Sequence, residues 1–115
     1  LDRGNLHRVL GTAQLYAIFG RIDALLTPTM PTVAPLIAAP DLSGRHRQFT
    51  LPFSFAGLPA LSVPCGFNAI GLPIGLQIIG NTLQEGMILR IAAAYERVTG
   101  FYRRKPPIHC GVSTG

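Results

Sequence analysis

The most apolar part of the chain is the stretch from Gln48 to Gly80, which contains no charged residue. Such a stretch is typical of segments that lie in a protein interior rather than on its surface. Glycine and proline interrupt it at intervals, which excludes one long helix and a membrane span. We therefore expect a short helix, a strand, a turn and a second strand, all of them in the interior.

The first piece of this stretch has the signals of a short helix. Thr50 is a suitable N-cap, and Pro52 falls in the first turn, where its missing N–H costs little. Gly57 is a suitable C-terminal stop. We expect the helix to lie between these residues.

Two strands follow, over residues 60–67 and 73–80, and turn-forming residues 68–71 join them. The short connection predicts an antiparallel hairpin. Pro64 cannot donate to a sheet ladder, which indicates an edge strand or a bulge. In the first strand, the side chains on one face are large and those on the other, here named the bare face, are small. The large set is Leu61, Val63, Cys65 and Phe67, and the bare face carries Ala60, Ser62, Pro64 and Gly66. The bare face predicts that a backbone or a ligand approaches it closely.

The flanking segments predict two longer helices and one more strand. A helix is expected over residues 2–21, a short buried strand over 23–27, and an extended proline-rich segment over 28–40. A polar loop over 41–47 has its tip at Ser43 and Gly44. Thr82 and Glu85 have the spacing of a capping box for a helix that ends before Gly100. The predicted buried stripes are Leu6, Val9, Leu10, Ala13, Tyr16, Ala17 and Gly20 in the first helix and Met87, Ile88, Ile91, Ala92, Tyr95 and Val98 in the last.

The composition and charge of the chain restrict the kinds of molecule that it is expected to bind. The chain has 115 residues and a formal charge of +5, concentrated in residues 45–47 and 103–105. Both basic clusters lie in predicted loops, no aromatic residue interleaves with Arg45 or Arg47, and no nucleic-acid motif occurs, so we expect solvated loops and no nucleic-acid partner. The His and Cys residues lack metal-ligand spacing, and no cofactor motif occurs. Cys65 and Cys110 are expected to be free thiols in a reducing, cytoplasmic compartment, and no membrane partner is expected.

These elements predict an α/β fold with a partial mixed β-sheet flanked by helices. Three strands alone cannot bury both faces of a sheet. The isolated chain is therefore expected to be marginally stable or to self-associate, for example as a homo-oligomer.

The same residues carry a family resemblance. The runs Phe53-Ser-Phe-Ala-Gly-Leu-Pro-Ala-Leu-Ser-Val-Pro-Cys-Gly-Phe67 and Gly71-Leu-Pro-Ile-Gly-Leu-Gln-Ile-Ile-Gly80 resemble the C-terminal end of the amidase signature hydrolases. The resemblance covers residues 6–108. It implies that residues 1–115 are the C-terminal segment of a single, incomplete amidase domain. Residues 106–115 are expected to form a loose tail.

The family resemblance implies a catalytic triad of a lysine, a bridging serine and a nucleophilic serine. The glycine- and serine-rich stretch and the upstream lysine that carry it are absent from this sequence. Lys105, the only lysine, follows the last helix and is a poor general base at its ordinary pKa. We therefore expect no catalytic residue here, and Cys65 is interpreted as a structural core residue.

The resemblance also implies that the segment before and through the Thr-x-Pro helix lines the acyl side of the substrate pocket. By position, the candidate substrate-binding residues are Arg47, Gln48, Phe49 and Ser54. Family members that hold glutamine have an acidic residue where this chain has Arg47, and usually asparagine where it has Ser54. Both departures favour another amide substrate. Gln77 is expected to satisfy backbone groups of a strand or loop.

The sequence thus predicts part of an amidase that cleaves carboxamides and acts with the remainder of its domain on a small-molecule amide. Two alternatives stay open. One is the A subunit of a tRNA-dependent amidotransferase, which hydrolyses glutamine. The other is a non-catalytic remnant or interaction module that kept the scaffold.

Overall fold

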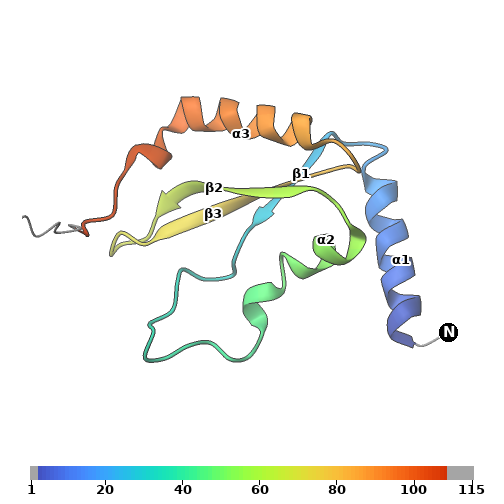
Figure 1. Cartoon of the computed structure of the whole chain (residues 1–115), viewed down its shortest axis with the longest axis horizontal. Helices are drawn as coiled ribbons and strands as arrows, with labels where there is room; N and C mark the ends of the chain where they lie inside the picture. Colours follow the sequence, from blue (N-terminus) through green and yellow to red (C-terminus); the bar gives the residue numbers. More distant parts are fainter. Residues whose placement is uncertain (1–2, 109–115) are drawn as a thin grey trace, which may run out of the picture.

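The computed structural model describes residues 3–108, with the side chains of residues 5–9 excluded. It confirms the α/β class: a three-stranded antiparallel sheet has α3 on one face and α2 on the other, while α1 lies at one end beside α2 (Figure 1). The elements are α1 (Arg3–Ile18), β1 (Ala24–Pro28), α2 (Leu51–Ala56), β2 (Ala60–Phe67), β3 (Pro73–Gly80) and α3 (Glu85–Thr99), with short 3₁₀ helices at Arg45–Arg47 and Phe101–Arg103.

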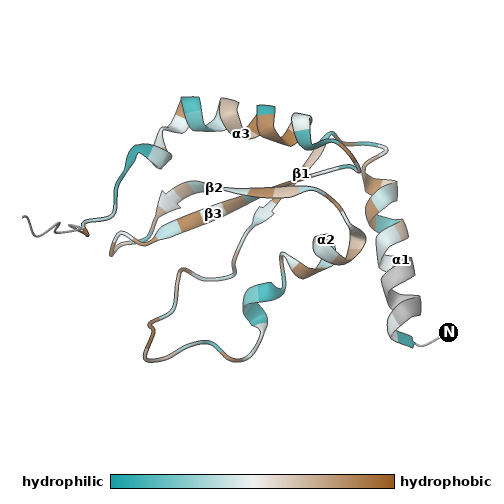
Figure 2. Cartoon of the chain, in the orientation of Figure 1, coloured by the Kyte–Doolittle hydropathy of each residue, from teal (hydrophilic) through white to brown (hydrophobic). Residues whose placement is uncertain are grey.

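Strand β3 lies at the centre of the sheet, whose order is β1-β3-β2. It pairs antiparallel with both neighbours, for example Leu25 with Ile79 and Leu61 with Ile78. Successive side chains of a strand point to opposite faces, so Ile78 and Ile79 enter different layers. Both are fully buried, and Figure 2 shows the apolar residues along β3. The expectation of a strand buried on both faces is confirmed for this half of β3.

The two layers form two hydrophobic cores. Ile78 packs between the sheet and α3, and Ile79 packs between the sheet, α2 and the end of α1. The α3-side core comprises Val63, Ile78, Ile88 and Ala92, and the α2-side core comprises Phe19, Phe53, Ala56, Leu58 and Ile79.

The predicted hairpin is confirmed at both strands. Asn68 shapes its turn, because the Asn68 side-chain oxygen accepts hydrogen bonds from the backbone N–H of Ile70 at 3.2 Å and of Leu72 at 2.8 Å. Gly71 adopts a positive φ of 89° in the same turn. The ladder between β2 and β3 shifts register between Pro64 and Gly66, and β2 is an edge strand, as Pro64 indicated.

The proline-rich segment is confirmed as irregular, since no helix or strand lies between β1 and Arg45. In the polar loop, Asp41 accepts hydrogen bonds from the hydroxyl of Ser43 at 2.5 Å and from its backbone N–H at 2.9 Å. These two bonds lower the pKa of the exposed Asp41 carboxyl. Gly44 follows with a φ of 79°, and the chain then turns into the 3₁₀ helix.

Both predicted N-caps are wrong in detail. Helix α2 begins after Thr50, but the Thr50 hydroxyl donates backwards to the carbonyl of Arg47 at 3.4 Å and caps no N–H of the helix. Helix α3 begins at Glu85, and no side chain caps it. Leu83 has a φ of +61°, which turns the chain out of the helical path between Thr82 and Glu85 and prevents a capping box. The C-terminal glycines are confirmed: Gly57 and Gly100 are both left-handed.

The predicted buried stripe of α1 is wrong where the structure describes it. Phe19, just after the helix, is buried and Leu15 packs against it, whereas Leu10 is 53% exposed and Tyr16 is 41% exposed. The reason is that only the C-terminal end of α1 reaches the core. The side chains of Leu6 and Val9 lie outside the described residues. The stripe of α3 is confirmed at Ile88 and Ala92 and wrong at Val98, which is 87% exposed.

Large apolar side chains remain exposed on the sheet and helices, including Leu26 of β1 at 55% and Ile74 of β3 at 40%. We therefore expect the isolated 115-residue chain to self-associate or to unfold over a broad temperature range. Light scattering and a thermal melt measure this. A sharp cooperative melt of a monomer in dilute solution would contradict the expectation.

The contact between β3 and α3 gives a second prediction. A Cβ on Gly80 would lie 2.7 Å from Cγ2 of the buried Ile88, so Gly80→Ala should destabilise the fold by about 1–3 kcal/mol through overpacking. Gly86→Ala is the matched control: nothing lies within 4 Å of its Cβ, and alanine favours the helix by up to about 1 kcal/mol. Denaturant titration of both variants at the same protein concentration compares them. Equal midpoints would contradict the packing argument.

Candidate functional site

The bare face of the hairpin is occupied by a pair of hydroxyl groups. Thr29 Oγ1, just beyond β1, and Ser62 Oγ of β2 lie 2.6 Å apart and share a hydrogen bond across β3. They lie directly over Gly75, where a Cβ would be 2.8 Å from each oxygen. The predicted close approach to the bare face is therefore made by side chains of the chain itself.

Gln77, two residues along β3 on the same face, is 4% exposed. Its Nε2 donates to Thr27 Oγ1 at 2.8 Å and to the backbone carbonyl of Phe49 at 2.7 Å. A carbonyl only accepts, so the Phe49 contact fixes which end of the amide is nitrogen. The expectation that Gln77 satisfies a loop backbone group is confirmed. One side chain thus joins β1, β3 and the segment before α2.

These polar groups border a cavity of about 270 Å³, here named the hydroxyl pocket. Thr50 and Ser54 bring two further hydroxyls to it from α2 and its start. The full lining is Thr29, Thr50, Phe53, Ser54, Leu58, Ala60, Leu61, Ser62 and Gln77. None of these lining residues is ionisable near neutral pH. The hydroxyl pocket is therefore suited to orient a polar group by neutral hydrogen bonds, and it offers no general base.

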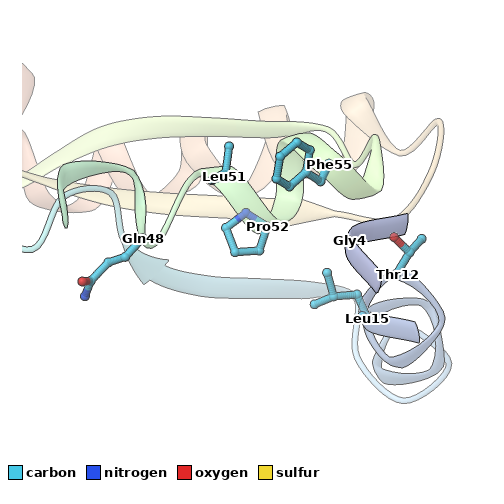
Figure 3. Close-up of a pocket in the computed structure, with 8 residues that line it drawn as sticks. Gly4, Thr12, Leu15, Gln48, Leu51, Pro52 and Phe55 are labelled. Carbon is cyan, nitrogen blue, oxygen red and sulfur yellow. The ribbon is translucent and has the colours of Figure 1, made fainter. Parts of the chain in front are cut away.

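A larger cavity of about 560 Å³ lies between α1 and α2 and is here named the α1–α2 groove. Figure 3 shows Leu51, Pro52 and Phe55 of α2 and Leu15 of α1 along it. The lining is Gly4, Gly11, Thr12, Leu15, Gln48, Leu51, Pro52 and Phe55. Most of these side chains are apolar, so the groove is suited to hydrocarbon rather than to charged groups.

The structure divides the four predicted site residues among different surroundings. Ser54 lines the hydroxyl pocket, and Gln48 lines the α1–α2 groove. Phe49 is half-buried and lines neither of these two cavities, and its carbonyl accepts a hydrogen bond from Gln77. Arg47 is exposed at the end of the 3₁₀ helix and lines neither cavity. The four residues are neighbours in sequence, but they do not converge on one point.

Sequence reasoning did not identify Thr29 and Ser62 as site residues. The bare face of the first strand was a usable signal for Ser62. Thr29 carries no local signal, because it lies in a proline-rich segment and reaches Ser62 only through the β1–β3 pairing.

The part of the chain that the structure describes gives little support for metal binding or for thiol catalysis. Residues 3–108 contain no group of three His, Cys, Asp or Glu side chains that could hold a metal ion. Cys65 is a half-buried free thiol in β2. Cys110 and most of the predicted loose tail (residues 106–115) lie outside the described residues. No helix within the described range is long and apolar enough to cross a bilayer.

Comparison with known proteins gives consistent results. The chain is 48% identical over 95 residues to the A subunit of the glutamyl-tRNA(Gln) amidotransferase of Synechococcus sp. (strain JA-3-3Ab), and the alignment covers 78% of this chain and 18% of that protein. The crystal structure of the corresponding protein from Thermotoga maritima superposes with a TM-score of 0.69 at 36% identity, covering 83% of this chain and 22% of that one. The structure of 6-aminohexanoate cyclic dimer hydrolase superposes with a TM-score of 0.71 at 28% identity, covering 87% and 24%.

The chain therefore spans only about a fifth of the length of these relatives. The family model described as Amidase matches residues 3–89. With this match over most of the sequence and the shared fold, the chain belongs to the amidase family, whose signature enzymes hydrolyse C–N bonds.

Proposed function

We propose that this chain forms the C-terminal part of an amidase domain that hydrolyses carboxamide C–N bonds of a small-molecule substrate. The observation that carries the proposal is the family match over residues 3–89. The alignment with only 18% of a relative supports the view that the remainder of the domain completes the site. A cytoplasmic location stays a prediction.

The catalytic groups of this amidase are proposed to lie outside these 115 residues, as a lysine, a bridging serine and a nucleophilic serine. The chemistry of the hydroxyl pocket supports this assignment. Ser54 and Ser62 are both exposed, and the Ser62 hydroxyl is hydrogen-bonded to the Thr29 hydroxyl, which is no base. An unassisted hydroxyl is a weak nucleophile, because a serine needs an adjacent base to remove its proton. The isolated chain is therefore proposed to be inactive.

The contribution of this chain is a wall of the substrate pocket. Residues 47–54 run from the 3₁₀ helix into α2, so their backbone is held by local structure at both ends. They carry apolar surface at Leu51 and Pro52 and a hydroxyl at Ser54, which together suit an amide with a hydrocarbon acyl part. Arg47, Gln48, Phe49 and Ser54 stay candidates for substrate binding.

A second candidate function is glutamine hydrolysis in a tRNA-dependent amidotransferase. The 48% identity to the Synechococcus protein favours it. The residue Arg47 opposes it, since a guanidinium cannot accept a hydrogen bond from the ammonium group of glutamine. The two functions differ in substrate, so one substrate panel separates them.

The location of the nucleophile can be tested with a serine-reactive fluorophosphonate. We expect it to label the full-length protein that contains this chain and to stop its hydrolysis of carboxamides. We expect neither labelling nor hydrolysis with the isolated chain. Peptide mass spectrometry locates the labelled serine. A label on Ser54 or Ser62 would overturn the proposal that the nucleophile lies outside these 115 residues.

The role of Arg47 can be tested by reversing its charge in the full-length protein. Arg47→Asp should raise kcat/KM for glutamine relative to that for a simple aliphatic amide by about tenfold, because a carboxylate attracts the substrate ammonium. Arg45→Asp is the matched control, since Arg45 is exposed in the same 3₁₀ helix and lies outside the predicted site. A wild type that already prefers glutamine, with no gain in Arg47→Asp, would favour the amidotransferase function instead.

A further inference from the structure

Gln77 is the one buried polar side chain in the core of the described chain, and it is the only link by side-chain hydrogen bonding between the sheet and the start of α2 that the described residues show. Both hydrogens of its amide nitrogen are used, one by Thr27 Oγ1 and one by the carbonyl of Phe49. The distances of 2.8 and 2.7 Å are those of well-formed hydrogen bonds.

The Phe49 carbonyl lies at a special point of the chain. It precedes α2 by two residues, and it is not used in the backbone hydrogen bonds of the turn, where the Arg47 carbonyl accepts from Thr50 N–H and the Thr50 carbonyl from Ser54 N–H. Phe49 itself is half-buried. The bond from Gln77 therefore links this segment to the sheet by a hydrogen bond, in addition to the packing of Phe53 against Ile79.

The other bond of Gln77 makes this position rigid. Thr27 lies opposite Gln77 in the β1–β3 ladder, and its hydroxyl also donates to the Pro28 carbonyl at 3.0 Å. The hydrogen of Gln77 Nε2 that does not bond to Phe49 is therefore bonded to Thr27, and this second bond restrains the orientation of the amide plane. A side chain with a fixed orientation places its second hydrogen with little freedom.

We propose that Gln77 is a positioning residue that fixes the substrate-pocket wall at residues 48–54 through the Phe49 carbonyl, and thereby sets affinity and size selectivity for the amide. The inference rests on the proposed function, because it needs that wall to meet substrate. Gln77 acts through Phe49 and is not a catalytic residue.

A purely structural role of Gln77 predicts a different kinetic result. If Gln77 only stabilised the fold, its loss would lower the amount of active protein, while the KM of each remaining active molecule would stay unchanged. If it positions the wall, KM changes in molecules that are folded and active, and it changes most for substrates large enough to contact the wall.

The test uses full-length protein with Gln77→Met, which keeps the side-chain length and removes both donors. Active molecules are counted with the serine-reactive phosphonate, and kinetics are measured with a short and a long aliphatic amide. We expect KM for the long amide to rise about tenfold or more, with a smaller change for the short amide and in kcat per active site.

Thr27→Val is the matched control. It has nearly the same shape, removes the Thr27 partner of Gln77 and leaves the bond to Phe49 in place. It should lower the melting temperature and raise KM for the long amide clearly less than Gln77→Met does, because the bond to the Phe49 carbonyl remains although the orientation of the amide is less restrained.

A second variant covers the case in which Gln77→Met fails to fold. Gln77→Glu is acceptor-only when ionised but regains one donor when protonated, and burial raises the pKa of such a carboxyl. The ratio of its KM to the wild-type KM for the long amide should therefore fall as pH decreases. The wild type measured at each pH removes the pH dependence of the catalytic groups themselves.

The outcomes separate the two proposals. A wild type that hydrolyses no amide overturns the proposed function and this inference with it. An active wild type in which Gln77→Met, or the ionised form of Gln77→Glu, leaves both KM values unchanged overturns the inference alone. Equal rises of KM in Gln77→Met and Thr27→Val also overturn it, because they would point to general loosening of the sheet.

Discussion

The structure depends on the burial of one strand from both sides. Strand β3 uses both of its edges for pairing and both of its faces for packing. Ile78 and Ile79 are joined by one peptide bond, yet each belongs to a different core. Because side chains alternate along a strand, α3 and α2 are fixed on opposite faces as soon as β3 is in place. The hydroxyl pocket is lined by residues of β2, β3 and α2, so its position follows from this arrangement.

The α2 face of the sheet combines two kinds of residues. Near its buried end, Ile79 and the aromatic Phe19 and Phe53 exclude water. Toward its open end, the same strand presents Gln77 and Gly75, and hydroxyl groups gather over them. The amide nitrogen of Gln77 has a partner for each of its hydrogens, as a buried donor needs, since an unpaired polar group in a core costs stability. The apolar part of this face thus packs the core, and the polar part links β1, β3 and the segment before α2 by hydrogen bonds.

The strands, the hairpin, the bulge and the glycine stops were predictable from the sequence, because each depends on local signals such as alternation, Pro64 and left-handed glycines. The capping box failed because Leu83 leaves the helical path, which no propensity of Thr82 or Glu85 indicates. The predicted buried stripe of α1 was wrong because the burial of its residues depends on where α2 lies, and the position of α2 depends on β3. The family was predictable because residues 53–67 and 71–80 contain sequence strings typical of it. In the site, Gln77 and the bare face were visible in sequence, but the Thr29–Ser62 pair spans 33 positions and required the strand register.

The contact over Gly75 has an evolutionary consequence. With a Cβ at that position only 2.8 Å from both Thr29 Oγ1 and Ser62 Oγ, the three sites share one small volume. An extra methyl group there would displace both hydroxyls and break the hydrogen bond that they share. Homologues that carry a larger residue at the position of Gly75 should therefore have smaller ones at the positions of Thr29 or Ser62, so that substitutions at the three positions covary.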